Sequence, residues 1–252
     1  MNQIFTGDAL AMLRTLPDNI VQCCVTSPPY WGLRDYHMDD QLGLEATPDE
    51  YVAKLVEIMG EVRRVLRDDG TLWLNLGDSY ATKPYGDNHS FDPKYGGRNR
   101  SAGYPNRQPI TGIRPKNLIG IPWRVAFALQ ADGWYLRSDI IWHKPNAMPE
   151  SVTDRPSKAH EYIFLLSKSE KYFYDNIAIQ ERSICGDNGS SFTAGKTKVK
   201  NRRPVGVGER VDDGWRNRRS VWSVATTPYP EAHFATYPAP LITPYASLRW
   251  TR

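Results

Sequence analysis

An amphipathic helix followed directly by a short apolar strand is the feature that most constrains this fold. The segment 47–66 begins with T-P-D-E, in which Thr47 can cap the helix, Pro48 fits its first turn and Glu50 completes a capping box. Its apolar residues recur at helical spacing: Val52, Leu55, Val56, Met59, Val62 and Leu66. The next apolar run, 71–76 (T-L-W-L-N-L), is typical of a buried strand.

The same alternation of strands and helices recurs along the chain. Strands are predicted at 3–6, 21–26, 134–142 and 161–167, and helices at 8–16 and 122–131. The run at 21–26 (V-Q-C-C-V-T) is rich in β-branched residues and is expected to be buried. Strands and helices at this spacing predict an α/β protein with a mainly parallel sheet. A length of 252 residues allows one or two domains.

Composition excludes several classes of protein. The formal net charge is only +4, so any binding to a polyanion must come from local clusters. No apolar run is long enough to span a membrane, and residues 1–10 do not resemble a signal peptide. Three cysteines, Cys23, Cys24 and Cys185, exclude a disulfide framework or a zinc site and favour a reducing cytoplasm. The scattered histidines show no metal-binding spacing, so no metal is expected.

Two polar stretches interrupt the alternation and carry a local excess of positive charge. Residues 82–116 contain seven Lys or Arg against two acids, and residues 182–219 contain ten against four. They can be solvated insertions, or they can neutralise nucleic-acid phosphates. We expect a catalytic α/β domain at 1–181, a small target-recognition region at 182–220, and the C-terminal part of the catalytic domain at 221–252.

A rigid turn with oxygen acceptors and flat rings follows the strand at 21–26. Ser27-Pro28-Pro29-Tyr30-Trp31 begins where that strand ends, and ligands of open α/β sheets bind beyond the carboxyl ends of strands. The two prolines restrict the backbone, so the Ser27 hydroxyl and the carbonyl oxygens are held in place. A ring stacked on Tyr30 could present an exocyclic amino group to these acceptors. A proline-rich turn with buried aromatic residues is the alternative interpretation.

The segment T-S-P-P-Y-W at 26–31 resembles the catalytic motif of the amino-group DNA methyltransferases, which methylate N4 of cytosine or N6 of adenine. Further blocks of the chain resemble this family in order: G-D-A-L at 7–10, N-L-G-D-S-Y at 75–80, R-S-D-I-I-W-H-K-P-N at 137–146, P-E-S at 149–151, H-E-Y-I-F-L-L-S-K at 160–168, Y-F-Y-D at 172–175 and H-F-A-T-Y-P at 233–238. Their order resembles the β-type arrangement. The resemblance implies a Rossmann-like methyltransferase sheet with long basic loop insertions.

The resemblance ends after Pro238. The family continues there to a glycine-rich loop that contacts S-adenosylmethionine, whereas residues 239–252 contain no glycine. From this we expect either a truncated chain that binds DNA without catalysis, or one subunit of a split enzyme whose partner chain supplies the loop. An RNA or protein-amide methyltransferase is disfavoured by the Thr26-Ser27 pair and by the early position of the motif.

The resemblance implies S-adenosylmethionine as cofactor and direct methyl transfer to a base flipped out of double-stranded DNA, as in restriction-modification or phage modification. Tyr30 would stack on that base, Ser27 and the Pro28 carbonyl would accept from its amino group, and Pro29 would hold the turn. Ser27 favours cytosine, with adenine possible. Cys23 and Cys24 need no catalytic role.

Further site residues follow from the same resemblance. Those expected to bind the cofactor are Asp8, Thr26, Asp78, Tyr237 and Pro238. Those expected to bind DNA are Trp31, Lys144, Arg202, Arg203, Arg216, Arg218 and Arg219. Asp8 could instead cap a helix, Asp78 could belong to a turn, and Lys144 could be a solvated strand end. His160 and Glu161 could form a general-base pair, although a buried polar network is the favoured interpretation. A homodimer, a cytoplasmic location near the nucleoid and no membrane association complete the predictions.

Overall fold

The chain divides into two compact units. The first consists of Met1–Phe173 and Ser220–Leu241, and the second of Tyr174–Arg219 and Ile242–Arg252. The computed structural model describes residues 3–33, 36, 40–81, 112–182, 215–227 and 236–246, with the backbone alone for 245 and 246.

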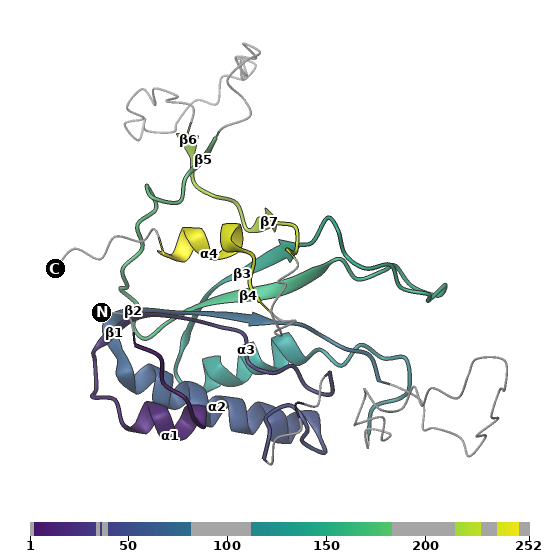
Figure 1. The fold of residues 1–252 in the computed structure, drawn as a ribbon, viewed down its shortest axis with the longest axis horizontal. Helices are drawn as coiled ribbons and strands as arrows, with labels where there is room; N and C mark the ends of the chain where they lie inside the picture. Colours follow the sequence, from purple (N-terminus) through teal and green to yellow (C-terminus); the bar gives the residue numbers. More distant parts are fainter. Residues whose placement is uncertain are drawn as a thin grey trace, which may run out of the picture. The chain divides into compact units, whose positions relative to one another are not determined.

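The first unit is built on a five-stranded sheet, shown in Figure 1. Its strands are β1 (Val21–Thr26), β2 (Leu66–Leu76), β3 (Tyr135–His143), β4 (His160–Ser167) and β7 (Val221–Ser223). They are ordered β1-β2-β4-β3-β7. The pairs β1–β2 and β3–β7 are parallel, whereas β4 is antiparallel to both of its neighbours. Four strands therefore run one way, and β4 runs against them in the middle of the sheet.

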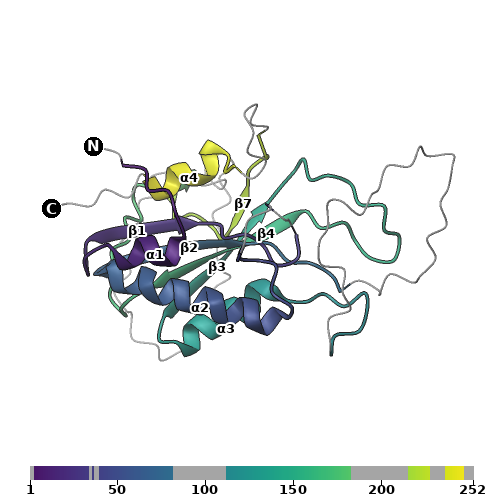
Figure 2. The same ribbon diagram turned by 60° about the horizontal axis from the view of Figure 1, so that its bottom comes forward.

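Three helices cover one face of this sheet: α1 (Ala9–Arg14), α2 (Pro48–Val65) and α3 (Ile121–Ala131) (Figures 1 and 2). Thr47 caps α2 as expected, accepting a hydrogen bond from the Glu50 amide at 3.2 Å. Alternate residues of β2 point toward the helices, because side chains alternate along a strand. The shared core includes Leu55, Met59, Leu72, Leu74, Leu76, Leu129, Phe164 and Leu166. Each fully buried leucine stabilises the fold by roughly 1.5–3 kcal/mol.

The predicted helices and most predicted strands are confirmed, with three differences. Residues 3–6 form no strand; Ile4 is 95% exposed, so nothing in the described sheet pairs with this segment. β1 is only partly buried because it lies at an edge of the described sheet. β2 begins at Leu66 rather than at 71, with an irregular register against β1. The sheet is mixed rather than mainly parallel, because β4 is antiparallel to both neighbours and makes two of the four strand pairs antiparallel.

In the second unit, β5 (Glu181–Arg182) pairs antiparallel with β6 (Trp215–Arg216). Glu181 accepts hydrogen bonds from Arg216 at 2.9 Å and Arg219 at 2.7 Å, and the Arg182 guanidinium lies 4.5 Å from the Trp215 ring centre. The helix α4 (Ala239–Ala246) begins in the first unit and continues into residues of the second. No helix within the described ranges is both long and apolar enough to cross a membrane.

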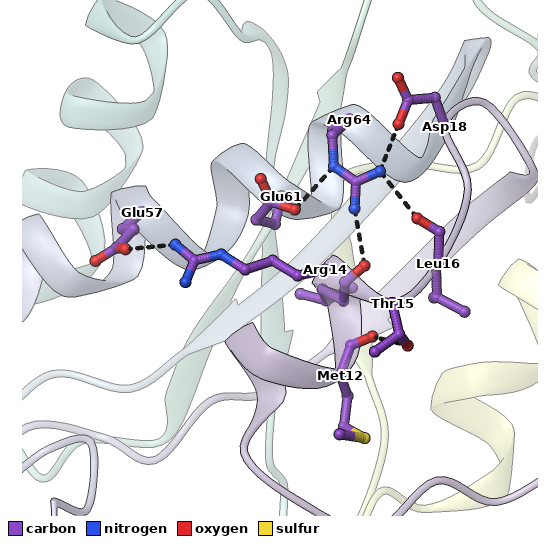
Figure 3. Close-up of polar contacts among 9 residues, drawn as sticks. Met12, Arg14, Thr15, Leu16, Asp18, Glu57, Glu61 and Arg64 are labelled. Carbon is purple, nitrogen blue, oxygen red and sulfur yellow. Dashed lines mark hydrogen bonds and ion pairs between the residues drawn. The ribbon is translucent and has the colours of Figure 1, made fainter.

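Arg64 of α2 holds the connection between α1 and β1, as Figure 3 shows. Its guanidinium donates to the Leu13 and Leu16 carbonyls at 2.8 and 2.9 Å, and it pairs with Asp18 at 2.5 Å. Glu61 accepts from Nε at 2.8 Å. A planar guanidinium can reach all four acceptors at once, whereas a lysine ammonium has no such geometry. The end of α1, which leads into β1, is thereby fixed to α2.

We predict that Arg64→Lys lowers the melting temperature, because lysine keeps the charge but loses most of these hydrogen bonds. Arg14→Lys is the matched control, since Arg14 forms an exposed ion pair with Glu57, at 3.1 Å, which is drawn in Figure 3. Differential scanning calorimetry measures both. Equal melting temperatures for the two variants would contradict the assigned role of Arg64.

Candidate active site

The ends of four strands bring the candidate site together at one edge of the sheet. β1, β2 and β3 end at this edge, and β4 begins there because it runs in the opposite direction. In the register, Leu76 lies opposite Tyr162 and His143 opposite His160. Segments far apart in the sequence therefore meet beyond the carboxyl ends of the parallel strands, the usual ligand-binding edge of such sheets.

Two hydrogen bonds from buried side chains hold the turn after β1 in place. The Tyr51 hydroxyl donates to the Pro29 carbonyl at 2.8 Å, and the Trp31 indole donates to the Glu45 carbonyl at 3.0 Å. Both rings are buried in the core. Gly43 packs against the turn with a φ of +98°, and a Cβ there would lie 3.0 Å from the Tyr30 carbonyl oxygen. The turn is thus rigid for reasons beyond its two prolines.

The Tyr30 ring packs directly on the backbone of Gly77, just past the end of β2. A Cβ built on Gly77 would lie 2.6 Å from a carbon of this ring, closer than any real contact of that kind. No side chain other than hydrogen therefore fits beneath the ring. This contact explains why a glycine occupies position 77 of the N-L-G-D segment, a role that the sequence pattern alone did not indicate.

Hydrogen bonds also hold the Tyr30 side chain at its hydroxyl group. It donates to Glu161 Oε2 at 2.8 Å and accepts from Asn75 Nδ2 at 2.6 Å, while Ser27 Oγ approaches it at 3.4 Å. Asn75 Nδ2 also donates to Glu161 Oε2 at 2.8 Å, and Lys144 forms an ion pair with Glu161 Oε1. Glu161 therefore accepts from three segments of the chain at once, in a partly buried polar network of Tyr30, Asn75 and Lys144.

The environment keeps the tyrosine of this network protonated. Burial raises the pKa of Tyr30 well above its usual value, and the negative charge of Glu161 raises it further. Burial also raises the pKa of the Cys24 thiol to about 12. The half-buried Cys23 and Cys24 are free and, at neutral pH, protonated, which fits a packing role rather than a nucleophilic one.

Two buried polar atoms near this turn have no hydrogen-bond partner in the part of the chain that is described. They are Asn75 Oδ1 and the Tyr237 hydroxyl. Burial raises the pKa of Tyr237, the nearby Ser27 side chain lowers it, and the charge of Glu161 raises it, so this phenol lies beside the Tyr30 turn. Buried polar groups normally have partners, so both atoms are candidates to bind a ligand.

Of the other residues expected to bind the cofactor, Asp8 and Asp78 accept hydrogen bonds from backbone amides. Asp8 caps α1, accepting from the Ala11 amide at 2.8 Å, which was the alternative considered for it. Asp78 Oδ1 accepts from the amides of Ser79, Gly120 and Ile121 at 2.9–3.1 Å, which joins the end of β2 to the start of α3. Thr26 ends β1 beside this site, and Pro238 is buried next to Tyr237 in the sequence.

The residues expected to bind DNA lie in different parts of the structure. Trp31 is 6% exposed and supports the turn from within the core, so it does not fit a DNA contact. Lys144 is paired with Glu161 and lies 4.3 Å from the Trp142 ring centre. Arg216 and Arg219 bond to Glu181 in the second unit, where Arg218 is half-buried. Arg202 and Arg203 lie outside the described residues.

Sequence reasoning missed a group of cations near the site. Arg155 pairs with Glu150 and lies 3.8 Å above the ring of Tyr80. Burial lowers the pKa of Lys158, while the charges of Asp78, Glu161 and Glu150 oppose that shift, which places Lys158 among these carboxylates. The P-E-S segment was quoted only as part of a block, and residues 155–158 (R-P-S-K) were not singled out. Within the described ranges, no group of His, Cys, Asp or Glu could hold a metal ion.

Comparison with known proteins identifies the class of enzyme. A family model described as DNA methylase, of the N6/N4 type, matches residues 21–245. The chain is 50% identical over 243 residues to the type II methyltransferase M.Cfr9I of Citrobacter freundii, covering 96% of this chain and 70% of that protein. It is 47% identical to M.SmaI of Serratia marcescens over 238 residues, covering 94% and 71%.

A solved structure shares the fold. The PvuII DNA methyltransferase, described as cytosine-N4-specific, superposes with a TM-score of 0.59 at 15% identity, covering 98% of this chain and 70% of that one. The chain belongs to the N6/N4 DNA methylase family and is a DNA methyltransferase with the Rossmann-like α/β fold of that class. The family resemblance drawn from the sequence motifs is confirmed. The expectation of a truncated, non-catalytic chain finds no support in these matches.

We predict that Gly77→Ala lowers methyltransferase activity on the order of 10²-fold, because the added methyl displaces the Tyr30 ring from its position. Gly60→Ala in α2 is the matched control, since a Cβ there meets nothing within 4 Å. It should retain activity and stabilise the protein by about 1 kcal/mol. Initial rates and urea denaturation measure the two effects. Full activity in Gly77→Ala would show that the ring position is unimportant.

Proposed function

We propose that this enzyme transfers a methyl group from S-adenosylmethionine to the exocyclic amino group of a base flipped out of double-stranded DNA. The supporting observation is the turn 27–30, with its Tyr30 ring fixed on Gly77 and its hydroxyl fixed by Glu161. With one face of the ring held on Gly77, we propose that the other face stacks on a planar base. Such stacking contributes about 1–3 kcal/mol per base, which offsets part of the cost of flipping.

In this proposal, the residues of the turn orient the amino group. Ser27 is exposed at the end of β1 and can accept one amino hydrogen, while the Pro28 carbonyl accepts the other. These hydrogen bonds would hold the nitrogen lone pair toward the methyl donor and raise its electron density. Proximity and orientation are the main contributions of such a site, since the reaction needs no covalent enzyme intermediate.

The polar atoms beside the turn fit a polar cofactor. S-adenosylmethionine, when bound, supplies an electrophilic methyl group on its sulfonium. The buried Tyr237 hydroxyl lies beside Ser27 and can bond to such a ligand, with Pro238, Thr26, Asp8 and Asp78 as the further proposed contacts. We infer N4 of cytosine as the favoured target from Ser27, with N6 of adenine as the second possibility.

DNA is the expected macromolecular partner, and so we place the enzyme at the bacterial chromosome, in the cytoplasm. We propose residues 182–220 as the recognition region and the rest of the chain as the catalytic domain. A homodimer and a complementing second chain remain predictions from the sequence. Light scattering of the purified chain, with and without DNA, measures the oligomeric state.

We predict that Tyr30→Ala lowers the rate of methyl transfer by about 10²-fold, because stacking and positioning are lost together. The assay follows tritium from labelled S-adenosylmethionine into duplex DNA, and mass spectrometry of the digested nucleosides identifies the methylated base. Tyr135→Ala is the control, since this exposed tyrosine begins β3 at the edge of the sheet opposite to the turn. Normal turnover of Tyr30→Ala would exclude the proposed turn, whereas DNA binding without transfer by the wild-type chain would favour a non-catalytic DNA-binding protein.

We also predict that replacing Arg202 and Arg203 by glutamine reduces the salt dependence of DNA binding, because each lost phosphate contact lowers the slope of log K against log salt by about 0.9. Arg216 and Arg219 are a less suitable pair to replace, since their bonds to Glu181 also hold β5 to β6. Fluorescence anisotropy at several salt concentrations measures the slope. An unchanged slope would place the DNA-binding surface elsewhere.

A further inference from the structure

We propose that Glu161 is a positioning residue that holds the Tyr30 ring on Gly77, an inference that rests on the proposed role of the turn 27–30. Glu161 lies at the start of β4, opposite Trp142 of β3 in the register. Its carboxylate accepts the Tyr30 hydroxyl hydrogen at 2.8 Å. The ring is thus fixed at two points, by the backbone beneath its carbons and by the carboxylate at its hydroxyl.

The hydrogen bonds of the Tyr30 hydroxyl are already made within the protein. It donates its single hydrogen to Glu161, and it accepts from Asn75 at 2.6 Å. Ser27 Oγ approaches it as a further donor at 3.4 Å. A phenol has one hydrogen to donate, so this hydroxyl has none left for a substrate. The ring face is then the part of Tyr30 that can contact a base, and the hydroxyl serves as an anchor.

The carboxylate is itself held in place. Lys144 neutralises it from the end of β3, and the two side chains are only 20% and 17% exposed. Asn75, which is 3% exposed, bridges Glu161 Oε2 and the Tyr30 hydroxyl with the same amide nitrogen. Charge-assisted hydrogen bonds in a partly desolvated setting are stronger and more directional than neutral ones. Lys144 and the Asn75 amide nitrogen therefore hold the Glu161 carboxylate in position.

A double-mutant cycle with Tyr30→Phe and Glu161→Gln tests this assignment. Phenylalanine keeps the stacking face and loses the anchor, and glutamine keeps the shape of Glu161 and loses its charge. We expect each single variant to lower kcat roughly tenfold, the loss of one charge-assisted hydrogen bond, with the KM for DNA unchanged. The double variant should lose no more than the worse single variant. Glu57→Gln, at an exposed surface ion pair, should behave as wild type.

Two outcomes overturn the proposal. If the kcat losses of the two single variants multiply in the double variant, Glu161 acts independently of the Tyr30 hydroxyl. If the losses in unfolding free energy, measured by urea denaturation of the same four proteins, simply add, the contact itself does not form. The second measurement does not depend on activity. The wild-type chain could fail to transfer a methyl group while the unfolding free energies of the four proteins still show coupling. That result would contradict the proposed function and would leave the contact between Glu161 and Tyr30 established.

Discussion

The contact between the Tyr30 ring and the backbone of Gly77 is the constraint on which the candidate site depends. It requires a residue without a side chain at the end of β2, a rigid turn after β1, and an anchor at the ring's hydroxyl. Each requirement is met by a different element. Tyr51 and Trp31 hold the turn from the core, so the apolar packing beneath the sheet also determines where the ring lies.

The reversed strand β4 supplies what a purely parallel sheet could not. A parallel β4 would end where it now begins, and Glu161 would then lie at the opposite edge. Its reversal brings a carboxylate to the edge where β1, β2 and β3 end. There it meets Lys144, which neutralises it and makes its burial tolerable. The site therefore combines the usual ligand-binding edge of an α/β sheet with an anionic anchor at its centre.

Much of the fold could be predicted because its elements have strong local signals. The α2 helix has a cap, a proline in its first turn and an apolar stripe, and the structure begins it at Pro48, directly after the predicted cap Thr47. The helix ends at Val65, because Leu66, the last residue of the stripe, already belongs to β2. The prediction of a strand at 3–6 was wrong, because the alternation of strands and helices along the chain cannot show that a given strand has a neighbour to pair with. The three-residue β7 was missed because so short a strand exists only through its pairing with β3.

The helices, the main strands, the rigid turn at 27–30 and the family could be predicted from local residue patterns and from motifs in a recognisable order. The contacts of Trp31 with Glu45, of Lys144 with Glu161 and of Gly77 with Tyr30 could not be predicted and were found only in the folded chain. These contacts join strands whose order and direction no local pattern specifies. Register and strand direction are properties of the assembled sheet, and they determine which side chains meet.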